Sequence, residues 1–143
     1  MRRVLQSAAV ALALALAGAA DAGPDLDYML YCMGCHGSEA QGLPGKIPPL
    51  AGSLTRFMRT SEGRDYVLRV PGAASSALSD AQLAAVLNWL AMRYSAAEER
   101  PPAPFTVDEV ERARHAPLAN VKERRREVVR RLAADGPAPP ADY

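Results

Sequence analysis

The chain has 143 residues, with 17 basic and 16 acidic side chains and a formal net charge of +1. This near balance argues against nucleic acid as a partner, because proteins that bind it concentrate basic side chains on one face. The length limits the protein to one small domain with an appendage. The chain has only two cysteines, Cys32 and Cys35, and they stand in one short motif.

The first 22 residues have the pattern of a secretory signal peptide. Met1-Arg2-Arg3 is positively charged, residues 4–17 are mostly Ala, Leu and Val, and Ala20-Asp21-Ala22 fits a small-x-small cleavage site. The apolar run is shorter than the about twenty residues that span a membrane. We therefore expect cleavage after Ala22 and export to the bacterial periplasm, with an uncleaved anchor as the alternative.

A helix is expected from Pro24, with Leu26, Leu30 and Met33 at helical spacing, and it leads into Cys32-Met33-Gly34-Cys35-His36. Two thiols three positions apart with an adjacent imidazole are the pattern of covalent haem attachment. Cys32 and Cys35 would form thioethers with the haem vinyl groups, and His36 would bind the iron. The motif predicts one covalently attached haem c with His36 as its proximal axial ligand.

Two other uses of the motif are disfavoured by its surroundings. A dithiol redox centre is expected within a βαβ unit, whereas the flanks of this motif have helical patterns. A zinc site needs about four ligands. The chain offers two cysteines and two histidines, and His115 lies far from His36 in the sequence.

Residues 37–52 are rich in Gly and Pro and predict a long loop. Its segment Pro48-Pro49-Leu50-Ala51-Gly52 would lay an apolar edge beside the His36 imidazole, unless it is an ordinary surface turn. Between residues 54 and 70 the apolar spacing predicts one or two short helices, broken at Gly63.

The best-defined helix follows Ser79-Asp80-Ala81-Gln82, which has the pattern of a capping box. Its apolar face should pack against the helix that carries Leu26 and Leu30. The residues at helical spacing on this face are Leu83, Val86, Leu87, Leu90 and Tyr94.

The composition changes after the haem domain, which we place at residues 23–97. Residues 98–104 are charged and then proline-rich, as in a stiff hinge. Residues 105–134 predict two helices, the second with a narrow apolar stripe among many basic side chains. That stripe would pack on the haem domain, or the helix would dock to an acidic partner or a membrane surface. The Pro- and Ala-rich residues 135–143 are expected to be disordered.

The chain resembles the class I cytochromes c over about residues 24–95. The resemblance is carried by the helix leading to Cys32-Met33-Gly34-Cys35-His36-Gly37, by Pro49-Leu50-Ala51-Gly52, and by the helix after Leu78. It implies a small all-α fold around one haem, with His36 as proximal ligand. It also implies a one-electron carrier between periplasmic redox proteins, alone or as a subunit of a larger oxidoreductase, rather than an enzyme. Membrane contact would be limited to the basic C-terminal helix or an uncleaved signal.

One departure from this family concerns the distal iron ligand. The family usually places a methionine in the loop shortly before the last helix, but residues 70–78 contain none, and Ala73 or a close neighbour takes that place. Met58 is one candidate ligand, because the other methionines lie in the signal peptide, beside the attachment motif or on an outward helix face. His115 is another, and a water-ligated or open iron is the third. An open iron would favour a ligand-binding or sensing haem protein instead of an electron carrier.

Overall fold

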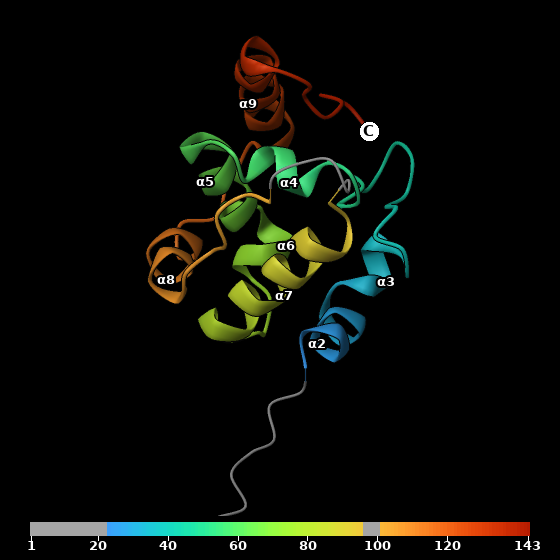
Figure 1. Cartoon of the computed structure of the whole chain (residues 1–143), viewed down its shortest axis with the longest axis vertical. Coiled ribbons are helices and arrows are strands. Elements are labelled where there is room, and N and C mark those ends of the chain that lie inside the picture. Colours follow the sequence, from blue (N-terminus) through green and yellow to red (C-terminus); the bar gives the residue numbers. More distant parts are fainter. Residues whose placement is uncertain (1–22, 96–100) are drawn as a thin grey trace, which may run out of the picture.

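The computed structural model describes residues 23–95 and 101–143, so the expected signal peptide and part of the expected hinge lie outside it. Within these ranges the chain is helical, with one isolated β-bridge between Leu43 and Ile47 (Figure 1). The all-α prediction is confirmed. The helices are α2 (Pro24–Tyr31), α3 (Met33–His36), α4 (Leu54–Phe57), α5 (Ser61–Arg69), α6 (Pro71–Ala74), α7 (Asp80–Arg93), α8 (Val107–Arg114) and α9 (Val121–Asp135).

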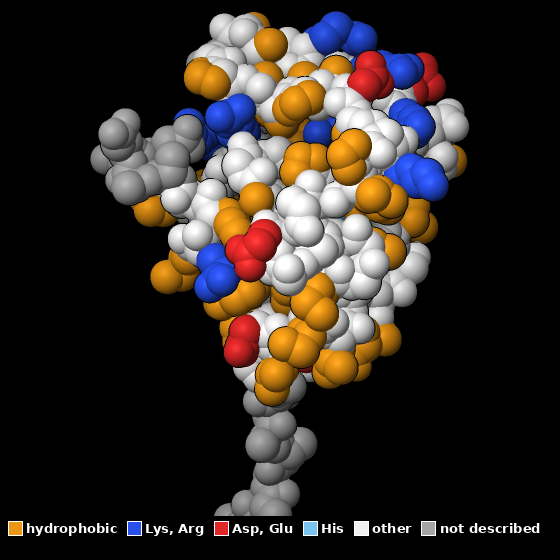
Figure 2. Space-filling model, turned by 90° about the vertical axis from the view of Figure 1, so that its right-hand side faces the viewer, with side chains coloured by type: hydrophobic (Ala, Val, Ile, Leu, Met, Phe, Trp, Pro, Cys, Tyr) orange, Lys and Arg blue, Asp and Glu red, His pale blue; other side chains and the backbone are white. Residues whose placement is uncertain are grey.

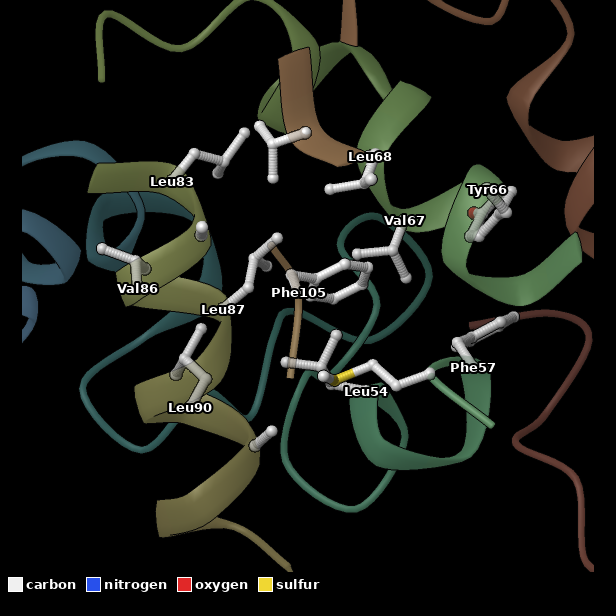
Figure 3. Packing of buried hydrophobic residues seen from close by; sticks show 14 of the residues in the cluster. Leu54, Phe57, Tyr66, Val67, Leu68, Leu83, Val86, Leu87, Leu90 and Phe105 are labelled. Carbon is white, nitrogen blue, oxygen red and sulfur yellow. The ribbon is translucent and has the colours of Figure 1, made fainter. Parts of the chain in front are cut away.

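Helix α7 forms the centre of the core. The predicted capping box is present: Ser79 Oγ accepts a hydrogen bond from the backbone N–H of Gln82, and the Gln82 side chain accepts one from the Ser79 backbone N–H. Figure 3 shows Leu87 pointing from α7 toward Phe105. The predicted apolar stripe is buried at Leu83, Val86, Leu87 and Leu90, and Tyr94 is partly buried.

Helix α2 packs against α7 as expected, but through a different face. Asp27 and Tyr28 are buried, and the Tyr28 ring lies 5.7 Å from the Trp89 ring, measured between centroids. Leu26 and Leu30, which we expected at this interface, are 48% and 70% exposed. The spacing was helical, but the large Tyr28 ring determines which face is buried. Figure 2 views the molecule from the right-hand side of Figure 1 and shows hydrophobic side chains gathered over the lower part of that face.

The break between α4 and α5 is earlier than predicted. Helix α4 ends at Phe57, and α5 begins at Ser61 after Thr60, whose side chain accepts a hydrogen bond from the Gly63 backbone N–H. Gly63 therefore lies inside α5. A Cβ atom there would overlap the Phe57 carbonyl oxygen, so glycine permits close approach of the two helices instead of interrupting one.

The C-terminal helices pack on the rest of the fold. Helix α8 contacts α5 and α7, and α9 contacts α5 (Figure 1). Phe105, just before α8, and Val110 of α8 are buried. Val128, Val129 and Leu132 are buried on α9, which confirms packing of the predicted apolar stripe.

The last residues of the chain fold back along α9. Arg125 Nε and Nη2 donate hydrogen bonds to the Pro140 carbonyl oxygen at 3.2 and 3.0 Å. Arg126 forms an ion pair with Asp142 at 2.8 Å. Arginine side chains of α9 thus bind the backbone and a carboxylate of this segment.

Arg64 of α5 joins the C-terminal helices to the rest of the protein. Its Nε and Nη2 donate to the two Glu109 carboxylate oxygens at 2.6 and 2.5 Å. Its Nη1 and Nη2 donate to the carbonyl oxygens of Ala103 and Pro104. The guanidinium also lies 4.3 Å from the centroid of the Phe105 ring. One side chain thus binds both the segment before α8 and α8 itself.

The Arg64–Glu109 pair makes stability depend on pH. Hydrogen bonds from Arg64 hold the pKa of Glu109 below its usual value. A lowered pKa in the folded state adds stability above the unfolded-state pKa of about 4.3, and this stability is lost as the pH falls through the lowered pKa. We expect Glu109→Gln to reduce the free energy of unfolding by about 1 kcal/mol at neutral pH and by little at about pH 2.

Denaturant unfolding at the two pH values measures this difference. Glu111→Gln changes an exposed carboxylate on the same helix and serves as the matched control. Equal losses for Glu109→Gln at both pH values would contradict the role of the ionised pair.

Candidate functional site

The attachment motif occupies the end of α2 and the single turn of α3. Cys32 ends α2, where its backbone N–H donates to the Tyr28 carbonyl oxygen at 2.9 Å. The backbone N–H of His36 donates to the Cys32 carbonyl oxygen at 3.0 Å, which closes the turn. Gly37 follows with a φ of 78°, a conformation that favours glycine. This compact turn brings Cys32, Cys35 and His36 together.

The His36 ring is held by the loop that follows the motif. Its Nδ1 lies 3.1 Å from the Pro48 carbonyl oxygen, which can only accept, so Nδ1 carries the proton in this hydrogen bond. Burial lowers the pKa of His36, and the bond to Pro48 opposes this shift. The result is a neutral imidazole whose Nε2 lone pair is available to a metal. The prediction that Pro48 and its neighbours lie beside the imidazole is confirmed.

The thiol chemistry does not fit a dithiol redox centre. Burial, followed by the nearby Asp27 charge, raises the pKa of Cys32 to about 11. Reactive cysteines in such centres have lowered pKa values. Within residues 23–95 and 101–143, no cluster of three or more His, Cys, Asp or Glu side chains is placed to hold a metal ion, as the zinc alternative would need.

The three motif side chains line a cavity of about 310 Å³. Its wall comes from the loop after the motif, from α4 to α7, and from the C-terminal extension. Most of the lining is apolar, so the cavity suits a large hydrophobic group. The apolar lining residues include Ile47, Pro48, Pro49, Leu50, Leu54, Phe57, Val67, Val70, Pro71, Ala73, Leu83, Val86, Leu87, Leu90 and Val121.

Three lining residues of the C-terminal extension, Val121, Arg125 and Tyr143, were not predicted as part of the site. Arg125 is 2% exposed, and its guanidinium lies 5.1 Å from the ring centroids of both Phe57 and Tyr143. Burial raises the pKa of Tyr66, and the interaction of Tyr66 with Arg125 opposes this rise only in part. No sequence pattern indicated this role, because Arg125 is one of several basic residues in a charged helix, and Tyr143 lies in a segment with a disordered composition.

Met58, the first candidate for the distal ligand, does not line this cavity. It directly follows α4, is 3% exposed, and lines a different depression, of about 1110 Å³, near Pro101–Ala103. No cysteine or histidine is among the described residues that line that depression. The arrangement therefore does not favour Met58 as distal ligand.

His115 is exposed at the end of α8 and does not line the cavity either. Ala73, at the position where the family resemblance puts a ligand, does line it. Among the described lining residues there is no methionine, and His36 is the single histidine.

The donor set and the cavity fit a covalently bound haem. Two thiols suited to thioethers stand beside a neutral imidazole with a free ring nitrogen, and all three border an apolar space. Cys32 and Cys35 would anchor the ring, and His36 would bind the iron. A haem bound here would supply reversible one-electron chemistry, and the chain would supply its anchors, its ligand and a mostly apolar environment.

The chain matches no protein-family model. It is 33% identical to a protein named cytochrome c-552 from Thermus thermophilus over 133 residues, which cover 80% of this chain and 87% of that protein. A second protein named cytochrome c-552, also from Thermus thermophilus, is 34% identical over 102 residues, or 58% of this chain and 78% of that protein. With this similarity and the haem-attachment motif at an apolar cavity, the chain belongs to the c-type cytochromes.

Proposed function

We propose that this protein is a periplasmic cytochrome with one haem c, of the class I type, that carries single electrons between redox proteins. The observation that carries the proposal is the arrangement of Cys32, Cys35 and His36 at one apolar cavity, with the His36 ring held by Pro48. Similarity to proteins named cytochrome c-552 supports the same function.

Each part of the site has a definite task in electron transfer. The two thioethers would keep the haem in place through both oxidation states. Pro48 holds the proton on His36 Nδ1 and fixes the plane of the imidazole. The apolar wall excludes water, which reduces the solvent rearrangement that accompanies a change in charge. Buried positive charge from Arg125 would favour the reduced iron.

The proposed location follows from the N-terminal pattern. Residues 1–22 lie outside the described part of the chain, so cleavage after Ala22 is inferred from the sequence. None of the described helices is long and apolar enough to cross a membrane. Donor and acceptor are proposed to be periplasmic redox proteins, with this protein acting alone or as a subunit of a larger oxidoreductase.

Film voltammetry of the purified haem protein tests the electron-carrier proposal. We expect one reversible one-electron wave under anaerobic conditions whose size is unchanged by hydrogen peroxide or nitrite. A current that rises with one of these compounds would show substrate turnover at the iron and contradict a carrier function.

Arg125 gives this proposal a quantitative test. Its guanidinium lines the cavity, so it disfavours the additional positive charge of oxidised iron. We expect Arg125→Gln to lower the reduction potential by an amount on the order of tens of millivolts, and Arg125→Lys to change it less. Spectroelectrochemical titration measures the potentials.

Arg126→Gln is the matched control, because Arg126 is the next residue, is half exposed, and pairs with Asp142 at the surface. The same shift in the Arg125 and Arg126 variants would show that net charge alone, rather than a charge at the cavity, sets the potential.

A further inference from the structure

The cavity wall near α6 is made of small and apolar side chains. Ala73 of α6 contributes only a methyl group, and Val67 and Val70 contribute branched aliphatic groups from α5 and its end. This is the region where the resemblance to class I cytochromes would place a second iron ligand. None of these three side chains has an atom that can coordinate iron.

Two polar side chains of the cavity wall, those of Ser76 and Tyr66, have partners elsewhere. The Ser76 hydroxyl donates to the Ala73 carbonyl oxygen at 2.9 Å. The Tyr66 hydroxyl interacts with Arg125, which itself donates to Pro140. Lys46 is exposed and lies two residues before Pro48, in the segment that holds His36.

The segment after Ala73 is also fixed in position. Arg114 of α8 is 7% exposed, and its Nη1 donates to the Leu78 carbonyl oxygen at 2.8 Å and to Asp80 Oδ1 at 3.0 Å. Its Nη2 donates to the Ser76 carbonyl oxygen at 2.8 Å. These bonds hold residues 76–80 against α8 and oppose a rearrangement that would bring another side chain to the iron.

We propose that the haem iron of this protein has an exchangeable sixth coordination position that takes a small neutral diatomic molecule, of the carbon monoxide or nitric oxide class. The inference rests on the proposed haem site. The ligand would lie against Ala73, Val67 and Val70, where an apolar wall accepts a neutral molecule and penalises the desolvation of a charged one. Arg125, the buried cation of the cavity, is bound to Pro140 and lies near the rings of Phe57 and Tyr143.

Carbon monoxide binding to the chemically reduced haem protein tests the proposal. With an open or water-ligated iron, the change in the optical spectrum should be complete, and its rate should rise in proportion to the carbon monoxide concentration. A rate that levels off at high concentration would mean that a protein side chain must first leave the iron, and would overturn the proposal.

Substitutions in the cavity wall test where the sixth coordination position lies. Ala73→Met offers a thioether to the iron, so we expect at least about tenfold slower carbon monoxide binding and a sulfur-to-iron charge-transfer band in the oxidised protein. Ala77→Met adds the same side chain at an exposed position of the same segment and should bind carbon monoxide like the wild type. If the wild type does not bind carbon monoxide while Met58→Leu does, Met58 is the sixth iron ligand and the proposal is overturned.

The outcomes separate this inference from the proposed function. Covalent haem with a reversible one-electron wave but no response to carbon monoxide overturns the exchangeable position and leaves the electron carrier standing. A protein purified without covalent haem overturns both.

Discussion

Replacing both Cys32 and Cys35 by alanine should abolish covalent haem attachment completely. Thioether formation requires the two thiols, and the chain has no other cysteine that could substitute. The measurement is haem absorbance that stays with the polypeptide after denaturation and acid extraction. We expect the wild type to retain its haem under these conditions and the double variant to lose all of it.

The same change should strongly destabilise the fold, because the haem would be part of the core. Without its group, the apolar cavity of about 310 Å³ would lack the packing contacts that the haem provides. The whole stability of a small domain is only about 5–15 kcal/mol, so this loss is large in proportion. We therefore expect the double variant to be largely unfolded by circular dichroism.

His36→Ala provides the contrasting variant. It leaves both thiols in place, so the haem should stay attached while the axial ligation and the reduction potential change. An unchanged ligand-field spectrum in His36→Ala would contradict the assignment of His36 as proximal ligand. Haem retained after denaturation of the double cysteine variant would contradict thioether attachment.

Replacing Arg114 by alanine should strongly destabilise the fold. The change removes a buried guanidinium and leaves the carbonyl oxygens of Ser76 and Leu78 and the carboxylate of Asp80 without this partner. Breaking such a buried charged network costs about 3–5 kcal/mol. Urea unfolding of the haem-loaded protein measures the loss.

Arg112→Ala is the control for this prediction, because it removes the same side chain from an exposed position two residues earlier on α8. We expect it to change the free energy of unfolding by less than about 0.5 kcal/mol. Similar losses in the two variants would mean that Arg114 acts through helix propensity or net charge and not through its bonds to residues 76–80.

The features that depend on neighbouring residues were predictable from the sequence. The attachment motif needs only residues 32–36, and the capping box at Ser79 with the stripe of α7 depends on spacing within one helix. Pro48 was placed correctly beside His36 because the loop between them follows the motif directly and is rich in turn-forming residues. For these parts, local chemistry and spacing determine the structure.

The features that depend on distant contacts were not predictable. The buried face of α2 is set by how Tyr28 packs against Trp89, and helical spacing fits more than one face. The contact of the last residues with α9 depends on Arg125, which the sequence shows only as one charge among many. Buried arginines bind backbone carbonyl oxygens, and a sequence pattern does not show which carbonyl oxygens these are.

The intact mass of the protein purified from the periplasm tests the central claim most directly. We predict the mass of residues 23–143 plus one haem, which would establish both cleavage after Ala22 and single covalent attachment. A mass equal to the polypeptide alone, with Cys32 and Cys35 free or joined in a disulfide, would contradict the account.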